Sequence, residues 1–207
     1  MRSFLRATAA AVTLLALSSC TGTRMVQTWR DPKYQAQPVK RVFIVAIMPN
    51  DRTRVVFENT VAQALLDRGI LSATATGTFP PGELDKEKAI QFVKDNKIDL
   101  VIVQHFKKKT ELAYLPGSLD YVPAAPYYGG WWSAYGTGNG FYYSSAYLEE
   151  DTTVTAETMI YSAHTDPETL VWSAASTTQN AQNAPGVAQS LTKVLMADLD
   201  KAGILVK

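Results

Sequence analysis

The sequence is poor in the side chains that most often bind metals or form cross-links. It contains one cysteine and two histidines among 207 residues. A single cysteine excludes an intramolecular disulfide bond. His105 and His164 are far apart, and no HxxxH, HExxH or CxxC spacing occurs, so we predict no metal site. We interpret His105 as a residue at the edge of the core and His164 as a turn residue with a solvated ring.

The sequence also lacks an excess of charge of either sign. Lys and Arg total 20 and Asp and Glu total 19, which gives a net charge of +1. This balance argues against nucleic acid as a partner, because such proteins need a basic surface. The apolar content of 46% is that of an ordinary globular chain, and the length predicts one domain.

Catalytic motifs are absent too. The sequence has no Gly-x-Ser-x-Gly motif, no phosphate-binding loop and no dinucleotide fingerprint. The glycines at 136, 138 and 140 neither follow a predicted strand directly nor begin a helix. Four carboxylates, Glu149, Glu150, Asp151 and Glu157, lie among threonines, a pattern typical of an exposed strand face. We therefore predict neither enzyme activity nor a cofactor, with a hydrolase that uses acidic residues near 149–157 as a minor alternative.

What the sequence does have begins at its N-terminus. Arg2 and Arg6 precede an uncharged, mostly apolar stretch over residues 7–17, the order found in secretory signal peptides. The stretch is too short to span a bilayer comfortably. We therefore predict that residues 1–19 are a signal peptide.

Leu17-Ser18-Ser19-Cys20 resembles the lipobox of bacterial lipoproteins, which implies that Cys20 receives a diacylglyceryl group and acyl chains such as palmitate. The alternative is a chance cysteine beside an ordinary cleavage site. Thr21 follows the cysteine where enterobacterial lipoproteins kept in the inner membrane usually have Asp. The resemblance thus implies a lipid anchor on the periplasmic face of the outer membrane.

The mature chain begins with a polar stretch from Thr21 to Pro38 that also contains Pro32. This composition predicts a tether over residues 20–38, followed by a domain over residues 39–207. Hydrophobic runs predict strands, and apolar residues at helical spacing predict helices. The predicted strands cover 39–48, 70–76, 99–106, 152–162 and 170–177, and the predicted helices cover 52–68, 85–96 and 183–203.

This order, β-α-β-α-β-β-β-α, predicts a single α/β domain with a mixed sheet of about five strands and three helices. Right-handed crossovers make the first three strands parallel, with the first in the centre. The turn-rich residues 164–168 predict an antiparallel hairpin that extends one edge of the sheet.

A long insertion over residues 111–150 interrupts the domain. It holds about half of the aromatic residues of the chain, interleaved with glycines, and Asp120 is the one charged residue between Leu115 and Leu148. Tyrosine and tryptophan suit surfaces that are partly wet. Three interpretations stay open: a flexible loop with no partner, a surface for a protein partner or a second copy, or contact with a membrane or glycan. The predicted partner-binding residues are Tyr127, Tyr128, Trp131, Trp132, Tyr135, Phe141, Tyr142 and Tyr143.

Several short motifs resemble those of uncharacterised bacterial lipoproteins classed as domains of unknown function. They are Trp29-Arg30-Asp31-Pro32, Phe57-Glu58, Leu66-Asp67-Arg68-Gly69, Ile98-Asp99-Leu100-Val101 and Leu170-Val171-Trp172-Ser173. More remotely, the element order is similar to that of the α/β lipoproteins of the curli-secretion channel and of penicillin-binding-protein activators. That likeness implies assembly rather than chemistry, although a fold alone does not fix a function.

Together these features predict a lipid-anchored periplasmic lipoprotein that acts as a non-enzymatic protein-interaction or assembly module. Its expected partners are the membrane, through the N-terminal lipid, and either another envelope protein or a second copy of itself. The alternative is a lipoprotein that contacts peptidoglycan or another glycan by stacking of Trp131, Trp132 and Tyr135 on sugar rings.

Overall fold

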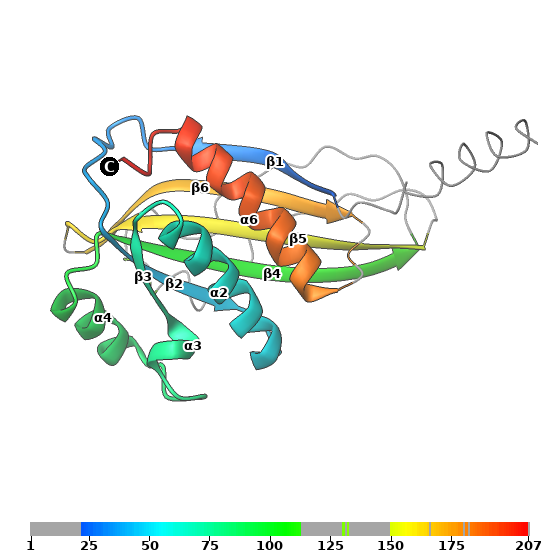
Figure 1. The fold of residues 1–207 in the computed structure, drawn as a ribbon, viewed down its shortest axis with the longest axis horizontal. Coiled ribbons are helices and arrows are strands. Elements are labelled where there is room, and N and C mark those ends of the chain that lie inside the picture. The colour runs from blue at the N-terminus through cyan, green and yellow to red at the C-terminus, as the bar shows by residue number, and fades with distance from the viewer. Residues whose placement is uncertain are drawn as a thin grey trace, which may run out of the picture.

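The structure, a computed structural model, describes residues 22–112, 130, 132, 150–165, 167–179, 181 and 183–206. These residues form six strands in one mixed sheet and four helices (Figure 1). The strands are β1 (Gly22–Arg30), β2 (Arg41–Ile47), β3 (Leu71–Thr74), β4 (Leu100–Leu112), β5 (Glu150–Ser162) and β6 (Thr169–Gln179). The helices are α2 (Asp51–Leu66), α3 (Ala75–Thr78), α4 (Lys86–Asp95) and α6 (Ala184–Lys201).

The strand order β1-β6-β5-β4-β2-β3 confirms the predicted α/β class and most of the predicted topology. Strand β2 lies between β3 and β4 and is parallel to both. Its central place explains why its residues are almost continuously apolar, since both of its faces are covered. Strands β5 and β6 form the predicted antiparallel hairpin beside β4.

Strand β1 corrects the prediction of a tether. Residues 22–30 pair antiparallel with β6, from Gly22 opposite Gln179 to Arg30 opposite Trp172. The strand is polar because it lies at the sheet edge and is half exposed, which made its pattern hard to distinguish from a linker. Its few apolar side chains divide between the two faces of the sheet, with Met25 on one and Trp29 on the other. The sheet therefore begins two residues after Cys20.

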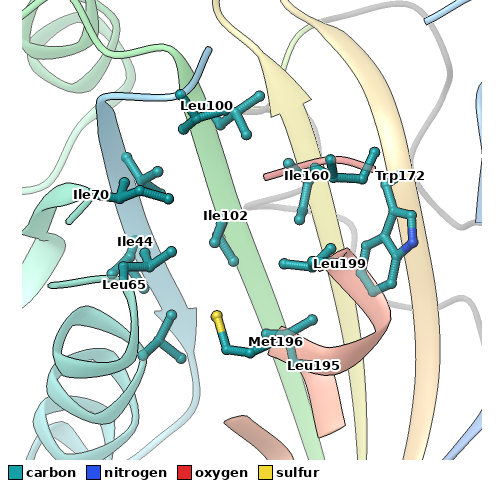
Figure 2. Close-up of a cluster of buried hydrophobic side chains, with 14 of the residues drawn as sticks. Ile44, Leu65, Ile70, Leu100, Ile102, Ile160, Trp172, Leu195, Met196 and Leu199 are labelled. Carbon is teal, nitrogen blue, oxygen red and sulfur yellow. The ribbon is translucent and has the colours of Figure 1, made fainter. Parts of the chain in front are cut away.

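Helices α2 and α6 cover one face of the sheet, which we call the front face (Figure 1). The alternate residues Val42 and Ile44 of β2 point to this face, as Leu100 and Ile102 of β4 do. Figure 2 shows how Leu195, Met196 and Leu199 of α6 and Leu65 of α2 meet these strand residues, with the indole of Trp172 on the far side of the cluster. Both long helices are thus fixed by burial of one apolar stripe.

Helices α3 and α4 lie on the opposite, back face. Phe43 of β2 contacts the rings of Phe79 and Phe92, with centroid distances of 6.3 Å and 5.1 Å. Val93 of α4 and Val101 of β4 complete this packing. The back-face cluster continues along β5 and β6 through Met159, Tyr161 and Leu170.

The helix boundaries follow from their capping residues. The side-chain oxygen of Asn50 accepts a hydrogen bond from the backbone N–H of Thr53 at the start of α2, and Asn183 does the same for Gly186 at the start of α6. Gly69, with φ of 77°, follows α2 in the left-handed conformation. No helix within the described residues combines the length and apolar character needed to cross a membrane.

Candidate functional site

The structure describes few of the residues that the sequence marks as functional. Cys20 lies outside the described residues, as do seven of the eight predicted partner-binding residues, namely Tyr127, Tyr128, Trp131, Tyr135, Phe141, Tyr142 and Tyr143. Trp132 is described, together with Gly130. Between Leu112 and Glu150, the structure therefore places these two residues relative to the sheet.

Gly130 and Trp132 lie on the back face, near the turn between β5 and β6. Trp132 is partly buried and packs against the back-face cluster. Gly130 is buried, and a Cβ atom added to it would lie 3.8 Å from the backbone nitrogen of Glu168 and 2.5 Å from its Oε2. Glu168 is itself buried and precedes β6. Part of the Trp132 surface is thus used for packing within the domain.

The two ends of the insertion attach at the opposite end of the sheet. Leu112, the last residue of β4, pairs with Glu150, the first residue of β5. Gly22 and Gln179 pair at the same end of β1 and β6. We call this end of the sheet the Gly22 end, and the end that carries the β5–β6 turn the hairpin end. Strand β6 has 11 residues, so the two ends are roughly 34 Å apart along it.

Gly130 offers a direct test of this attachment. Its φ is +68°, a conformation that costs alanine about 1–2 kcal/mol. We expect Gly130→Ala to lower the free energy of unfolding by at least that amount, as measured by chemical denaturation, because the close contact with Glu168 adds to the backbone strain. Glu168→Ala in the same background is the control, because removing the carboxylate relieves the close contact but not the backbone strain. Full recovery of stability in the double variant would contradict the role assigned to φ.

A buried acid and a histidine meet in the middle of the back face. His105 of β4 pairs directly with Glu157 of β5, and both side chains are buried, with Glu157 at 0% exposure. Directly paired residues on one face have Cβ atoms about 4.5–5.5 Å apart. The prediction of an exposed strand face is therefore wrong for Glu157, because the back face is covered here. Burial, followed by the charge of Glu157, raises the pKa of Tyr161 well above its ordinary value.

The pair does not form an open catalytic site among the described residues. The five cavities described in this part of the chain are lined by other side chains. His164 lies elsewhere, in the β5–β6 turn, where its Nε2 is 3.7 Å from Oδ1 of Asp99. Within the described residues no three His, Cys, Asp or Glu side chains cluster closely enough to hold a metal ion.

An uncharged cavity opens at the carboxyl end of β2, between the first turns of α2 and α6. It has a volume of about 360 Å³. In the sheet, β2 has β3 as its neighbour on one side and β4 on the other, so the chain leaves β2 in one direction and later returns on its other side. In α/β proteins, ligands often bind at the carboxyl ends of the strands where the strand order reverses in this way. We call it the switch-point cavity. Its lining residues are Met48, Pro49, Asn50, Thr53, Phe57, Phe106, Val154, Ala181, Asn183, Ala184 and Val187.

Sequence reasoning missed this cavity because its walls come from segments more than 100 residues apart. The available signals were the two capping asparagines, Asn50 and Asn183, and the aromatic residue Phe57 in the second turn of α2. Phe57 contacts Phe106 of β4 with a ring-centroid distance of 4.3 Å. The predicted strand order places the two strands side by side, but the register that brings these rings together is known only from the structure.

The motifs that carry the family resemblance hold structural roles. Oδ2 of Asp99 accepts hydrogen bonds from the backbone N–H groups of Lys40 and Arg41 and so fixes the start of β2. Trp172 is the largest fully buried side chain of the described residues. Glu58, from the motif Phe57-Glu58, is a buried acid on α2 and also has a structural role.

Glu58 is 0% exposed and joins three elements. Its Oε1 accepts the backbone N–H of Ala46 at 2.9 Å, and its Oε2 accepts the N–H and hydroxyl of Thr76 at 2.8 Å and 2.6 Å. The carboxylate thus replaces a neighbouring strand where β3 has ended. Burial raises the pKa of Glu58 more than these hydrogen bonds lower it.

Comparison with known proteins identifies no family for this chain. No family model matches the sequence, and no curated protein matches it. Two solved structures of PelC dodecamers from Paraburkholderia phytofirmans are 16% and 15% identical to this chain, with TM-scores of 0.46 and 0.45. Each alignment covers 84% of this chain, and the two alignments cover 95% and 94% of the PelC chains. A PDZ domain protein from Parabacteroides distasonis is 12% identical, with a TM-score of 0.45, over 93% of this chain and 39% of its own. Likenesses this weak assign neither a fold family nor a function.

Proposed function

We propose that the protein is a lipid-anchored envelope lipoprotein that binds another envelope protein, or a second copy of itself, without catalysing a reaction. In this proposal residues 1–19 are removed, Cys20 carries the lipid, and the domain lies on the periplasmic face of the outer membrane. The start of β1 at Gly22 supports the proposal, because it leaves a single residue, Thr21, between the lipidated Cys20 and the folded sheet. The anchored domain is then held close to the bilayer at its Gly22 end.

The location of Gly130 and Trp132 is the observation that carries the proposal. Both lie near the hairpin end, roughly 34 Å along the sheet from the Gly22 end. An anchor at Cys20 is therefore attached at the end of the sheet opposite these two residues. This geometry favours a protein or glycan partner over lipid headgroups at Gly130 and Trp132. Tyrosine and tryptophan are also the residues most enriched at protein interfaces.

Substitution of the predicted interface tests the proposal. We expect the variant with Tyr127, Tyr128, Trp131 and Tyr135 changed to serine to fold normally and to lose its crosslinked partner in native membranes. Trp132 is left unchanged because it packs against the sheet. The control is Leu66→Ser with Leu71→Ser, two side chains that are 54% and 58% exposed on another surface. An unchanged crosslinking pattern in the quadruple variant would refute the proposed interface.

Peptidoglycan contact is the second candidate, because the partly exposed Trp132 lies at the end of the sheet that an anchor would point away from the bilayer. Sedimentation with purified cell wall separates the two candidates. Glycan binding predicts that the wild-type protein pellets with the wall and that the quadruple variant stays in solution. If both proteins stay in solution while the crosslinked partner is lost in the variant, the partner is a protein.

A further inference from the structure

The switch-point cavity differs in its chemistry from most of the cavities described above. No charged side chain is among the residues that line it, whereas Lys, Arg, Asp or Glu side chains line three of the other four described cavities. Its walls include the rings of Phe57 and Phe106 and the side chains of Met48, Val154 and Val187. Its volume of about 360 Å³ is in the range of small-molecule sites, which are also mainly apolar. The lining therefore fits a hydrocarbon ligand.

The cavity lies at the same level of the sheet as the start of the mature chain. Thr23 pairs with Thr178, and Thr178 pairs with Val154, which lines the cavity. Two strand spacings separate Thr23 from Val154, which is about 10 Å. The hydroxyls of Thr23 and Thr178 are 2.7 Å apart, so both point to one face of the sheet.

Helix α6 provides a second link between the two places. The backbone N–H of Thr23 donates a hydrogen bond to Oγ of Ser190 at 3.1 Å. Ser190 lies one turn after Val187, which lines the cavity. Cys20 is three residues before Thr23, a distance of at most about 11 Å of extended chain. An acyl chain attached to Cys20 can therefore reach the cavity without any movement of β1.

We propose that the switch-point cavity binds one acyl chain of the lipid carried by Cys20. This inference rests on the proposed lipid anchor. The chain would pass around the first turn of α6 and place its methylene groups against Phe57, Phe106 and Val187. Burial of each methylene group favours binding. Binding would fix the orientation of the Gly22 end relative to the bilayer and would shield part of the lipid from water.

The test uses the full chain, produced in bacteria that are fed a photoreactive diazirine palmitate. After irradiation of the membranes, mass spectrometry maps the residues joined to the Cys20 lipid. We expect intramolecular crosslinks to cavity residues such as Phe106 and Val187. Ala184→Trp, which fills the cavity from the first turn of α6, is expected to reduce these crosslinks at least about tenfold, the change produced by losing two buried methylene contacts.

Ala62→Trp is the matched control, because Ala62 lines a different uncharged groove, on α2, and we expect it to leave the crosslinks unchanged. A lipidated Cys20 with crosslinks to bilayer lipids alone overturns the inference and leaves the proposed interaction module standing. Crosslinks of phospholipid chains to the cavity, in place of the Cys20 lipid, overturn it as well. A mature chain without lipid on Cys20 overturns both the inference and the anchor. If Ala184→Trp fails to fold, the wild-type crosslink map still decides.

Discussion

Replacing Trp172 with alanine is expected to lower the free energy of unfolding by about 3–5 kcal/mol. Trp172 lies on β6 between Arg30 of β1 and Ile160 of β5, and its side chain is 1% exposed. Its indole packs in the cluster that joins the sheet to α6 (Figure 2). Because close-packed cores collapse only partly around a deleted ring, the variant loses both burial and packing contacts.

Equilibrium denaturation of the mature domain measures this change. A loss of this size is a large part of the 5–15 kcal/mol that stabilises an ordinary domain. Leu66→Ala is the control, because Leu66 is 54% exposed and its loss should change stability by less than about 0.5 kcal/mol. Equal stabilities of the Trp172 and Leu66 variants would show that the cluster around Trp172 is not the core that holds α6.

The central part of the fold was predictable because its residues carry strong local signals. The apolar run at 42–47 requires a strand covered on both faces, and Asn50 and Gly69 mark the two ends of the helix that follows. The final helix is similarly bounded by Asn183 and Gly203. Each of these signals depends on neighbouring residues, so no knowledge of the tertiary structure was needed.

Strand β1 was missed because its stability is not local. Its side chains are mostly polar or half exposed, and two apolar residues, Met25 and Trp29, contribute to separate clusters. The strand is held instead by backbone pairing with β6, whose paired residues lie 142 to 157 positions later in the chain. An edge strand of this kind has no hydrophobic alternation from which a sequence pattern could identify it.

The sites show the same division. Trp132 was named as a surface residue on the basis of composition, yet composition does not reveal that part of its ring packs against the back face. Glu157 was assigned to an exposed face because threonines surround it in sequence, whereas its burial depends on what covers the sheet. The switch-point cavity depends on the register of β2 against β4 and on the path of α6, neither of which leaves a local signal.

Removal of the Glu58 carboxylate is expected to have the second large effect. Glu58→Ala leaves the buried N–H group of Ala46 and the half-buried N–H group of Thr76 without their acceptor, at a cost of about 1–3 kcal/mol each. We therefore expect a loss on the order of 4 kcal/mol. Glu58→Gln should cost less, about 1–3 kcal/mol, because its amide oxygen still accepts hydrogen bonds on one side. The remaining cost arises on the other side, where the amide NH2 group faces an N–H donor. Glu83→Gln, an exposed site on a loop, is the control.

The pH dependence of the Glu58→Gln difference tests the environment of this carboxyl group. Burial raises the pKa of Glu58 in the folded state above its ordinary value of 4.5. A raised pKa means that the folded state holds the proton more tightly than the unfolded chain, so the stability that this group contributes is fully present below pH 4.5 and declines as the pH rises through the folded-state pKa. Glutamine does not titrate. The difference in unfolding free energy between wild type and Glu58→Gln should therefore shrink as the pH increases from 4 towards neutrality. A difference that instead grows over this range would mean that the three hydrogen bonds lower the pKa of Glu58 more than burial raises it.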